Sequence, residues 1–315
     1  MYFIRRILFA IPLLLVISVI AFALCKLVPG GPFDSERRPA SPEIERNRLA
    51  RVHMDEPDWK QYLRFLGLVW KQDADGHWVH EPSTWNLSTK YRNHDVADVI
   101  GQGLPVSLTL GALSFLFAMG LGIPLGFYSA VKQGRWEDYS GSFLALLSFC
   151  VPSFVLAPFL VLMFAMKMKW FPVALWGSPW HLVLPTIALG SYFIGKIARL
   201  MREGMVQAAQ SEFITAARAK GLDETTLMFK HALRIAMLPV VSYAGPMLAD
   251  LLTGSFVVEN IFQLPGIGIY FITSIENRDY FMTVDLAVLY AMLLIGLNLL
   301  VDFSYTILDP RVKYE

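Results

Sequence analysis

Residues 104–131, LPVSLTLGALSFLFAMGLGIPLGFYSAV, contain no charged side chain over more than the length of a bilayer-spanning helix. Such a helix needs about 20 mainly apolar residues. Composition agrees, because 55% of the 315 residues are hydrophobic and 17% are charged, whereas roughly a quarter are charged in soluble domains. The chain is therefore predicted to be an integral membrane protein, and its net charge of +1 gives no reason to expect a nucleic-acid partner.

Five further runs have the same character, so we predict an all-α, polytopic membrane protein with six transmembrane helices. The six runs cover about residues 7–27, 104–131, 139–166, 182–201, 235–258 and 283–308. The second and third contain many small or helix-breaking residues, which permit close packing and kinks: Gly111, Gly120, Gly122, Pro124, Gly126 and Pro152. A bundle around a pathway can use them, whereas a simple anchor does not need them.

The first apolar run could also be a secretory signal, because it follows Arg5 and Arg6. It is longer than the apolar core of about 7–15 residues found in signals, and Pro29-Gly30-Gly31-Pro32 follows it in place of a small-x-small site. We expect an uncleaved first helix in residues 1–28, an extracytoplasmic segment in 29–103, a five-helix core in 104–310 and a tail in 311–315.

The distribution of Lys and Arg predicts the orientation, since short cytoplasmic loops are enriched in both. Three such residues fall on one side, at Lys167, Lys169 and Arg278. Thirteen fall on the side of the N-terminus: Arg5, Arg6, Lys132, Arg135, Lys196, Arg199, Arg202, Arg218, Lys220, Lys230, Arg234, Arg311 and Lys313. Both termini are therefore expected to be cytoplasmic.

The outer segment is polar and rich in tryptophan, and we expect a small, partly helical subdomain there. Asp58 could cap a helix that carries Trp59, Leu63, Leu66 and Trp70 at roughly helical spacing, and residues 73–76 predict a turn. His77 and His80 form only a weak metal pattern, and a solvated turn is favoured. Cys25 and Cys150 lie in apolar runs and predict packing, neither a disulfide nor a metal site.

The cytoplasmic segment 202–234 predicts a helix, a break and a second helix. Lys220 and Gly221 end the first helix, and Asp223 can cap the second. Phe213, Ala217 and Lys220 share one face at helical spacing. Such an element could dock into a groove of another protein or lie against anionic headgroups, and the residues alone leave both possibilities open.

Residues 213–222, FITAARAKGL, together with 229–234, FKHALR, resemble the EAA-type coupling loop of ABC importer permeases. The resemblance is strongest to the oligopeptide, dipeptide and nickel permease family, in which this chain looks most like the first permease subunit of an oligopeptide importer. Thr215 stands where the general motif has Glu, as is typical of the peptide branch. Residues 105–111, 254–259, 264–268, 277–280 and 302–311 agree, and about 71–90 look like an insertion.

The resemblance implies an ABC importer type I permease fold in a bacterial inner membrane, bound to lipid. It also implies four kinds of partner: a second homologous permease subunit in a heterodimer, two cytoplasmic ATPases, an extracytoplasmic solute-binding protein and a peptide substrate. ATP and Mg would bind the ATPases, because this chain has no P-loop and no catalytic or metal site of its own. Contact with the ATPases is expected at Ser211, Glu212, Phe213, Thr215, Ala216, Ala217, Arg218, Ala219, Lys220, Gly221 and Leu222.

Charges inside the spans yield further site predictions. Asp250 lies near the middle of the fifth span, where an Asp costs about 2.5–3.5 kcal/mol, so it either lines the substrate pathway or forms a buried hydrogen bond. Glu259 is predicted at an outer gate and pathway. Asp302, Asp309 and Pro310 are expected to be structural. Asp285 and Lys196 lie near span ends and are predicted to snorkel.

Other functions fit less well. An ion-driven secondary transporter would need buried ion sites and paired broken helices. A membrane protease would need a pattern such as GxSxG, HExxH or paired span aspartates, none of which the spans contain. Transport of nickel or another small solute stays open beside peptide transport.

Overall fold

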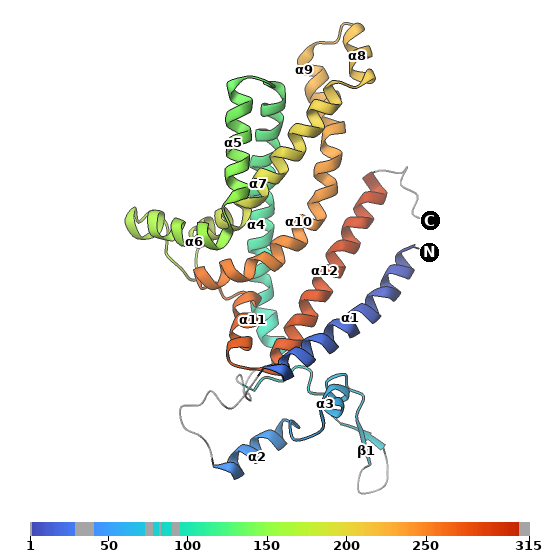
Figure 1. Ribbon diagram of the computed structural model, residues 1–315, viewed down its shortest axis with the longest axis vertical. Helices are drawn as coiled ribbons and strands as arrows, with labels where there is room; N and C mark the ends of the chain where they lie inside the picture. Colours follow the sequence, from blue (N-terminus) through green and yellow to red (C-terminus); the bar gives the residue numbers. More distant parts are fainter. Residues whose placement is uncertain (1, 29–40, 73–77, 82, 90–94, 309–315) are drawn as a thin grey trace. The chain divides into compact units, whose positions relative to one another are not determined.

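The computed structural model describes residues 2–28, 41–72, 78–81, 83–89 and 95–308, with the backbone alone for 2–5, 7, 42, 72, 253–254 and 301–308. It is mainly helical and divides into two compact units (Figure 1). Of the described residues, unit one contains those up to Leu104 and Ile269–Ile295, and unit two contains Pro105–Gly268 and Gly296–Leu308. Two helices, α4 (Val96–Val131) and α12 (Tyr280–Leu308), contribute residues to both units.

Unit one combines α1 (Tyr2–Leu27), α2 (Pro42–Arg51), α3 (Asp58–Phe65), most of α11 (Ile267–Glu276) and the starts of α4 and α12. It also contains an antiparallel hairpin, β1 (Trp70–Gln72) and β2 (Trp78–His80), in which Lys71 pairs with Val79. Phe65 of α3 packs with Val284 and Val288 of α12 and with apolar residues of α1. A second cluster joins Val96 and Val99 to Met282 and Leu286.

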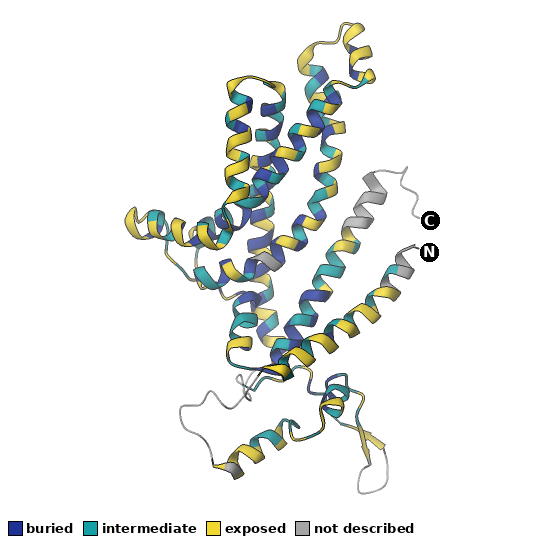
Figure 2. Ribbon diagram, in the orientation of Figure 1, coloured by how far each residue is buried: buried dark blue, intermediate teal, exposed yellow. Residues whose placement is uncertain are grey.

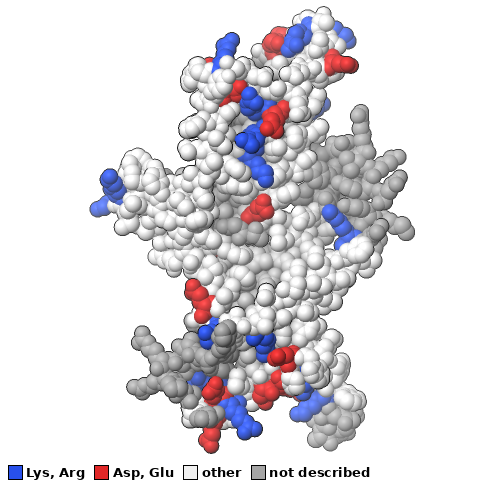
Figure 3. All heavy atoms as spheres, viewed as in Figure 1, with Lys and Arg blue, Asp and Glu red and all other residues white. Residues whose placement is uncertain are grey.

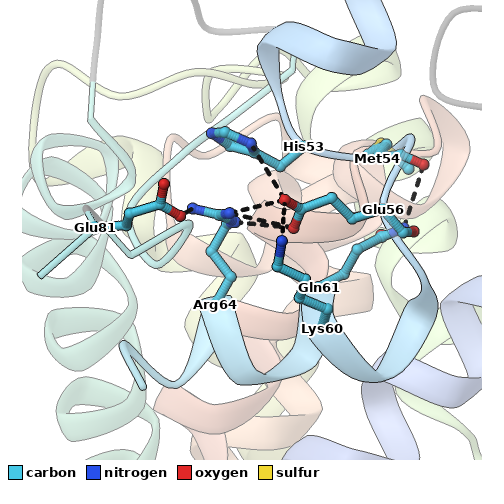
Figure 4. Close-up of polar contacts among 7 residues, drawn as sticks. All are labelled: His53, Met54, Glu56, Lys60, Gln61, Arg64 and Glu81. Carbon is cyan, nitrogen blue, oxygen red and sulfur yellow. Dashed lines mark hydrogen bonds and ion pairs between the residues drawn. The ribbon is translucent and has the colours of Figure 1, made fainter. Parts of the chain in front are cut away.

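A polar network holds α3 in unit one (Figure 4). Arg64, 2% exposed, donates to both carboxylate oxygens of Glu56 at 2.9 and 3.2 Å and forms an ion pair with Glu81. Lys60 binds the same Glu56 carboxylate at 2.9 Å, and the Gln61 amide donates to the Glu56 carbonyl oxygen at 2.6 Å. A buried arginine paired with two carboxylates therefore joins α3 to the segment that follows β2.

The short helix expected near Asp58 is confirmed, but its predicted cap is wrong. Pro57 occupies the N-cap position, and no side chain caps α3. Asp58 is the first helical residue, and its carboxylate binds Lys26 Nζ of α1 at 3.1 Å. The helix ends at Phe65, so Trp70 lies in β1. The predicted turn at residues 73–76 lies outside the described residues.

Unit two contains the rest of α4 followed by α5 (Trp136–Cys150), α6 (Ser153–Leu160), the π-helix η1 (Val161–Lys167) and α7 (Trp180–Ala209). The shorter α8 (Glu212–Ala219), α9 (Glu224–Thr226) and π-helix η2 (Leu227–Ala232) lead into α10 (Leu233–Phe262). Figure 1 shows α8 and α9 at the end of the bundle formed by α7 and α10. The buried residues of α7, α8, η2 and α10 share one core with those of α4, α6 and η1.

Glycines allow the helices of unit two to approach closely. A Cβ atom added to Gly126 of α4 would lie 2.2 Å from the Ala198 carbonyl oxygen of α7, and one added to Gly195 would lie 2.1 Å from the Ala145 carbonyl oxygen of α5. Apolar side chains of α5 such as Phe143 and Leu147 remain exposed, and Figure 2 shows exposed positions along the whole helix. Small residues at contacts and apolar residues outside are typical of a membrane bundle.

Among the described residues, five helices are long and apolar enough to cross a membrane: Leu8–Leu27, Val96–Val131, Trp180–Ala209, Glu224–Leu252 and Tyr280–Leu300. The third predicted span is not one straight helix, because Trp136–Cys150 and Ser153–Lys167 meet at a bend of 97°. Pro152 is the N-cap of α6, and proline lacks the N–H needed to continue a helix. A second bent pair, Ser255–Phe262 with Ile267–Glu276, also passes the length and composition test and was not predicted as a span.

Candidate functional site

The break between α8 and α9 has the helix–break–helix form expected from the sequence. Ser211 is the N-cap of α8 and its Oγ accepts from the Ile214 N–H at 3.5 Å. Gly221 has φ +85°, in the left-handed region that favours glycine. Asp223 caps α9 through the Thr226 N–H at 2.9 Å, and this hydrogen bond lowers the pKa of Asp223. The predicted C-terminal break and second cap are therefore confirmed.

All eleven residues predicted to contact the ATPases lie in α8 or immediately beside it. They do not share one outward face. Ala217, 8% exposed, packs with fully buried Ile214 and Leu227 in the core, whereas Phe213 is 57% exposed. The predicted common outward face of Phe213, Ala217 and Lys220 is thus wrong for Ala217, which attaches α8 to the bundle, whereas Phe213 and Lys220 are exposed.

The outer surface of this element carries apolar and charged side chains. Phe213, Leu222 and Phe229 are exposed, with the Phe213 ring 5.7 Å from that of His231. Arg218 binds Glu224 across the break, with Nη2 2.8 Å from Oε1. Figure 3 shows charged side chains gathered over α8 and α9. An exposed aromatic ring beside charges on a short, capped helix can dock into a groove of another protein.

An ion pair, which the sequence alone did not reveal, joins α5 to α7, the helix that precedes α8. Asp138 at the start of α5 accepts from Arg202 of α7 at 2.6 and 2.7 Å. It also accepts from Ser129 Oγ at 2.6 Å and from the Gly134 N–H at 3.0 Å. The only sequence signal was an acidic residue beside an apolar helix, and it did not indicate the partner.

Asp250 lies in α10 and is exposed in unit two. Seven residues earlier on the same helix, the Tyr243 ring carries Lys196 Nζ of α7 at 4.1 Å from its centroid. Lys196 lies within the 30-residue helix Trp180–Ala209, which is longer than a bilayer requires, so the prediction that it snorkels stays a prediction. Its ammonium contacts an aromatic face, a favourable cation–π geometry.

Glu259 is fully buried near the end of α10. Its Oε2 accepts from the Gly268 N–H at 2.8 Å, while Ser107 Oγ of α4 accepts from the Ile267 N–H at 3.0 Å. A Cβ atom on Gly266 would lie 2.3 Å from Oε2, so a larger residue there would force the Glu259 carboxylate to shift. This geometry holds the turn that follows α10, and the predicted gate role of Glu259 stays a prediction.

Asp285 of α12 is 1% exposed and its Oδ2 accepts from the Asn86 N–H at 2.9 Å in unit one. The prediction that Asp285 snorkels is therefore wrong. Asp302 lies in α12, but its side chain is outside the described part, as are Asp309 and Pro310 entirely. Within the described residues no group of three His, Cys, Asp or Glu side chains could hold a metal ion. His77 lies outside them, and His80 Nε2 lies 2.6 Å from the Gly67 carbonyl oxygen.

Comparison with known proteins gives consistent matches. Residues 122–314 match the model of the family described as binding-protein-dependent transport system inner membrane component. The chain is 39% identical to the oligopeptide transport system permease protein OppB of Haemophilus influenzae, with 98% of each chain covered. It is 38% identical to the dipeptide transport system permease protein DppB of Bacillus subtilis, with 99% of this chain and 97% of that protein covered.

Solved structures show the same fold. A chain of the inward-facing MetNI methionine ABC transporter matches with a TM-score of 0.57 and 18% identity, covering 68% of this chain and 97% of its own length. A likeness at this identity concerns the helical fold alone. It confirms the predicted permease fold, while the number of spans and the outer insertion stay predictions.

Proposed function

The chain belongs to the family of binding-protein-dependent transport system inner membrane components, and from this membership we propose that it is a permease subunit of an ATP-driven importer of oligopeptides or dipeptides. The observation that carries the proposal is the full-length similarity to peptide permeases of two bacteria. It performs no hydrolysis itself. It forms part of a path through the inner membrane, with both termini on the cytoplasmic side.

In this proposal α8 and the break at Gly221 receive movement from a cytoplasmic ATPase. Phe213 enters a groove of the ATPase, while Ile214 and Ala217 connect α8 to the bundle through the core. The ion pair between Asp138 and Arg202 joins α5 to α7 and lets these helices move together. The movement shifts a packed bundle between two arrangements. A second permease, two ATPases and a solute-binding protein complete the transporter, with ATP and Mg on the ATPases.

Phe213→Ala tests this role. The side chain is exposed, so its truncation should leave folding unchanged while lowering both ATPase copurification and ATP-dependent peptide uptake at least tenfold. Phe143→Ala is a matched control, because Phe143 is a similarly exposed phenylalanine on α5, away from the break. Equal effects of the two substitutions would contradict a specific coupling role.

The substrate is tested by reconstituting the purified permease with its partners and offering labelled peptides of graded length. We expect uptake that requires ATP and the binding protein. Uptake of nickel without peptide uptake would assign the transporter to the second candidate class. Transport by the isolated chain along an ion gradient would overturn the proposal.

A further inference from the structure

Lys196 is a cation in the middle of a membrane-length helix, and its ammonium contacts the Tyr243 ring at 4.1 Å. No carboxylate among the described residues forms an ion pair with it. A Lys side chain within an apolar span is costly to insert, and a single cation–π contact offsets only part of that cost. The Lys196 ammonium therefore needs water, a partner subunit or a ligand beside it.

Asp250 stands on the same face of α10 as Tyr243, because seven residues are nearly two complete helical turns. The axial rise between them is about 10 Å at about 1.5 Å per residue. Asp250 is exposed in unit two, although a carboxylate that faces lipid is costly. Along α10, a cation held on the Tyr243 ring is thus followed by an anion at about the length of three extended residues.

We propose that Lys196 and Asp250 bind opposite ends of the transported peptide, the ammonium of Lys196 its C-terminal carboxylate and Asp250 its N-terminal amine. This inference rests on the proposed function and assigns specificity residues to its pathway. A peptide with free termini carries both charges at a separation set by its length. A tripeptide spans the two sites when extended, and longer peptides fit by bending.

Tyr243 acts as a positioning residue in this scheme. Its ring holds the Lys196 side chain between α7 and α10 and so limits the rotamers of that side chain before the peptide binds. Less side-chain entropy is therefore lost on binding. Arginine at position 196 retains the charge, can stack on the same ring and can bind a carboxylate. Lys196→Arg is therefore the conservative variant and Lys196→Gln the disruptive one.

The test uses the complete reconstituted transporter with its binding protein. A tripeptide is first chosen, by calorimetry on the binding protein alone, so that its free, C-amidated and N-acetylated forms bind equally. Initial uptake of the three forms is then measured for each permease variant. Because the binding protein is constant, any change in the uptake ratios between variants originates in the permease.

We expect wild-type permease to transport the free peptide at least fivefold faster than either blocked form. Lys196→Gln should abolish the preference over the amide and retain the preference over the acetylated form, and Asp250→Asn should do the reverse. Lys196→Arg should retain both preferences. Lys167→Gln, which removes an exposed cation from η1, should also leave both unchanged.

Equal loss of uptake for all three forms in Lys196→Gln would overturn the inference and indicate pairing with the second permease. Unchanged ratios in both variants would overturn it as well. In either case the wild type still imports peptide, so the proposed function survives. Absence of peptide uptake by the wild type would overturn the proposed function itself.

Discussion

Arg202 and Asp138 form a two-point ion pair between α7 and α5, with Nε 2.6 Å from Oδ1 and Nη2 2.7 Å from Oδ2. The Asp138 side chain is 5% exposed and that of Arg202 is 30% exposed. Ser129 and Gly134 complete the shell around the carboxylate, so the turn between α4 and α5 is fixed to α7. The pair and its hydrogen-bond partners therefore connect α4, α5 and α7 within unit two.

Asp138→Ala should lower stability by about 3 kcal/mol, because it leaves Arg202 without its buried partner. The measurement is thermal unfolding of the purified protein in detergent. Glu224→Ala serves as the control, since it breaks the exposed pair with Arg218 and should cost less than about 1 kcal/mol. Similar losses of stability in the two variants would show that the Asp138–Arg202 pair stabilises the protein no more than the exposed Arg218–Glu224 pair.

Gly126→Ala should destabilise the bundle by about 3 kcal/mol, because the new Cβ would lie 2.2 Å from the Ala198 carbonyl oxygen. Gly120 lies on the same helix with nothing within 4 Å of an added Cβ. Gly120→Ala should therefore be neutral or stabilise by up to about 1 kcal/mol through helix propensity. Effects of the same sign at both positions, measured by thermal unfolding, would refute the packing argument.

Gly221→Val should weaken coupling, because a β-branched residue is strained at φ +85° and the turn after α8 would change. We expect at least a fivefold fall in peptide uptake per ATP hydrolysed. Gly221→Asn should retain most of the coupling, since Asn tolerates left-handed backbone. A Val variant that couples as well as the wild type would show that this conformation is dispensable.

Glu259→Ala should destabilise the turn after α10 by about 1–3 kcal/mol, because the buried Gly268 N–H loses its acceptor. Hydrogen exchange of residues 264–268 should rise in the variant. Glu203→Ala, an exposed acidic position on α7, supplies the control for loss of a carboxylate. If hydrogen exchange of the Gly268 amide is unchanged in Glu259→Ala, then Glu259 does not anchor the turn after α10.

The Glu56 network should weaken in acid. Burial alone would raise the pKa of Glu56, but hydrogen bonds from Arg64 and Lys60 outweigh it and hold the pKa below 4.5. Its contribution is therefore complete above pH 4.5 and is lost as the pH falls through the lower folded value. Glu56→Gln should speed hydrogen exchange of α3 at pH 7, with the difference from the wild type vanishing at low pH. Glu45→Gln, at an exposed position, should have no effect at either pH.

The sequence alone determined the membrane class, the family and the break at Gly221, because these depend on local chemistry. Apolar runs of membrane length need only their own residues, and capping by Asp223 involves neighbours three positions apart. The two-stranded hairpin was not predicted, and Pro152 was predicted only to permit a kink. The pairing of the hairpin and the 97° size of the bend each depend on where the following segment packs.

Only the tertiary structure decided which charges meet. Arg202 and Asp138 are 64 residues apart, and Lys196 lies on a different helix from Tyr243. It also decided that Ala217 faces the core while Phe213 faces outward. Helical spacing alone had placed both residues on one face. Long-range pairs depend on how the helices are rotated about their axes and on their close approach at residues such as Gly126 and Gly195. Neither can be deduced from the neighbouring residues of a single sequence.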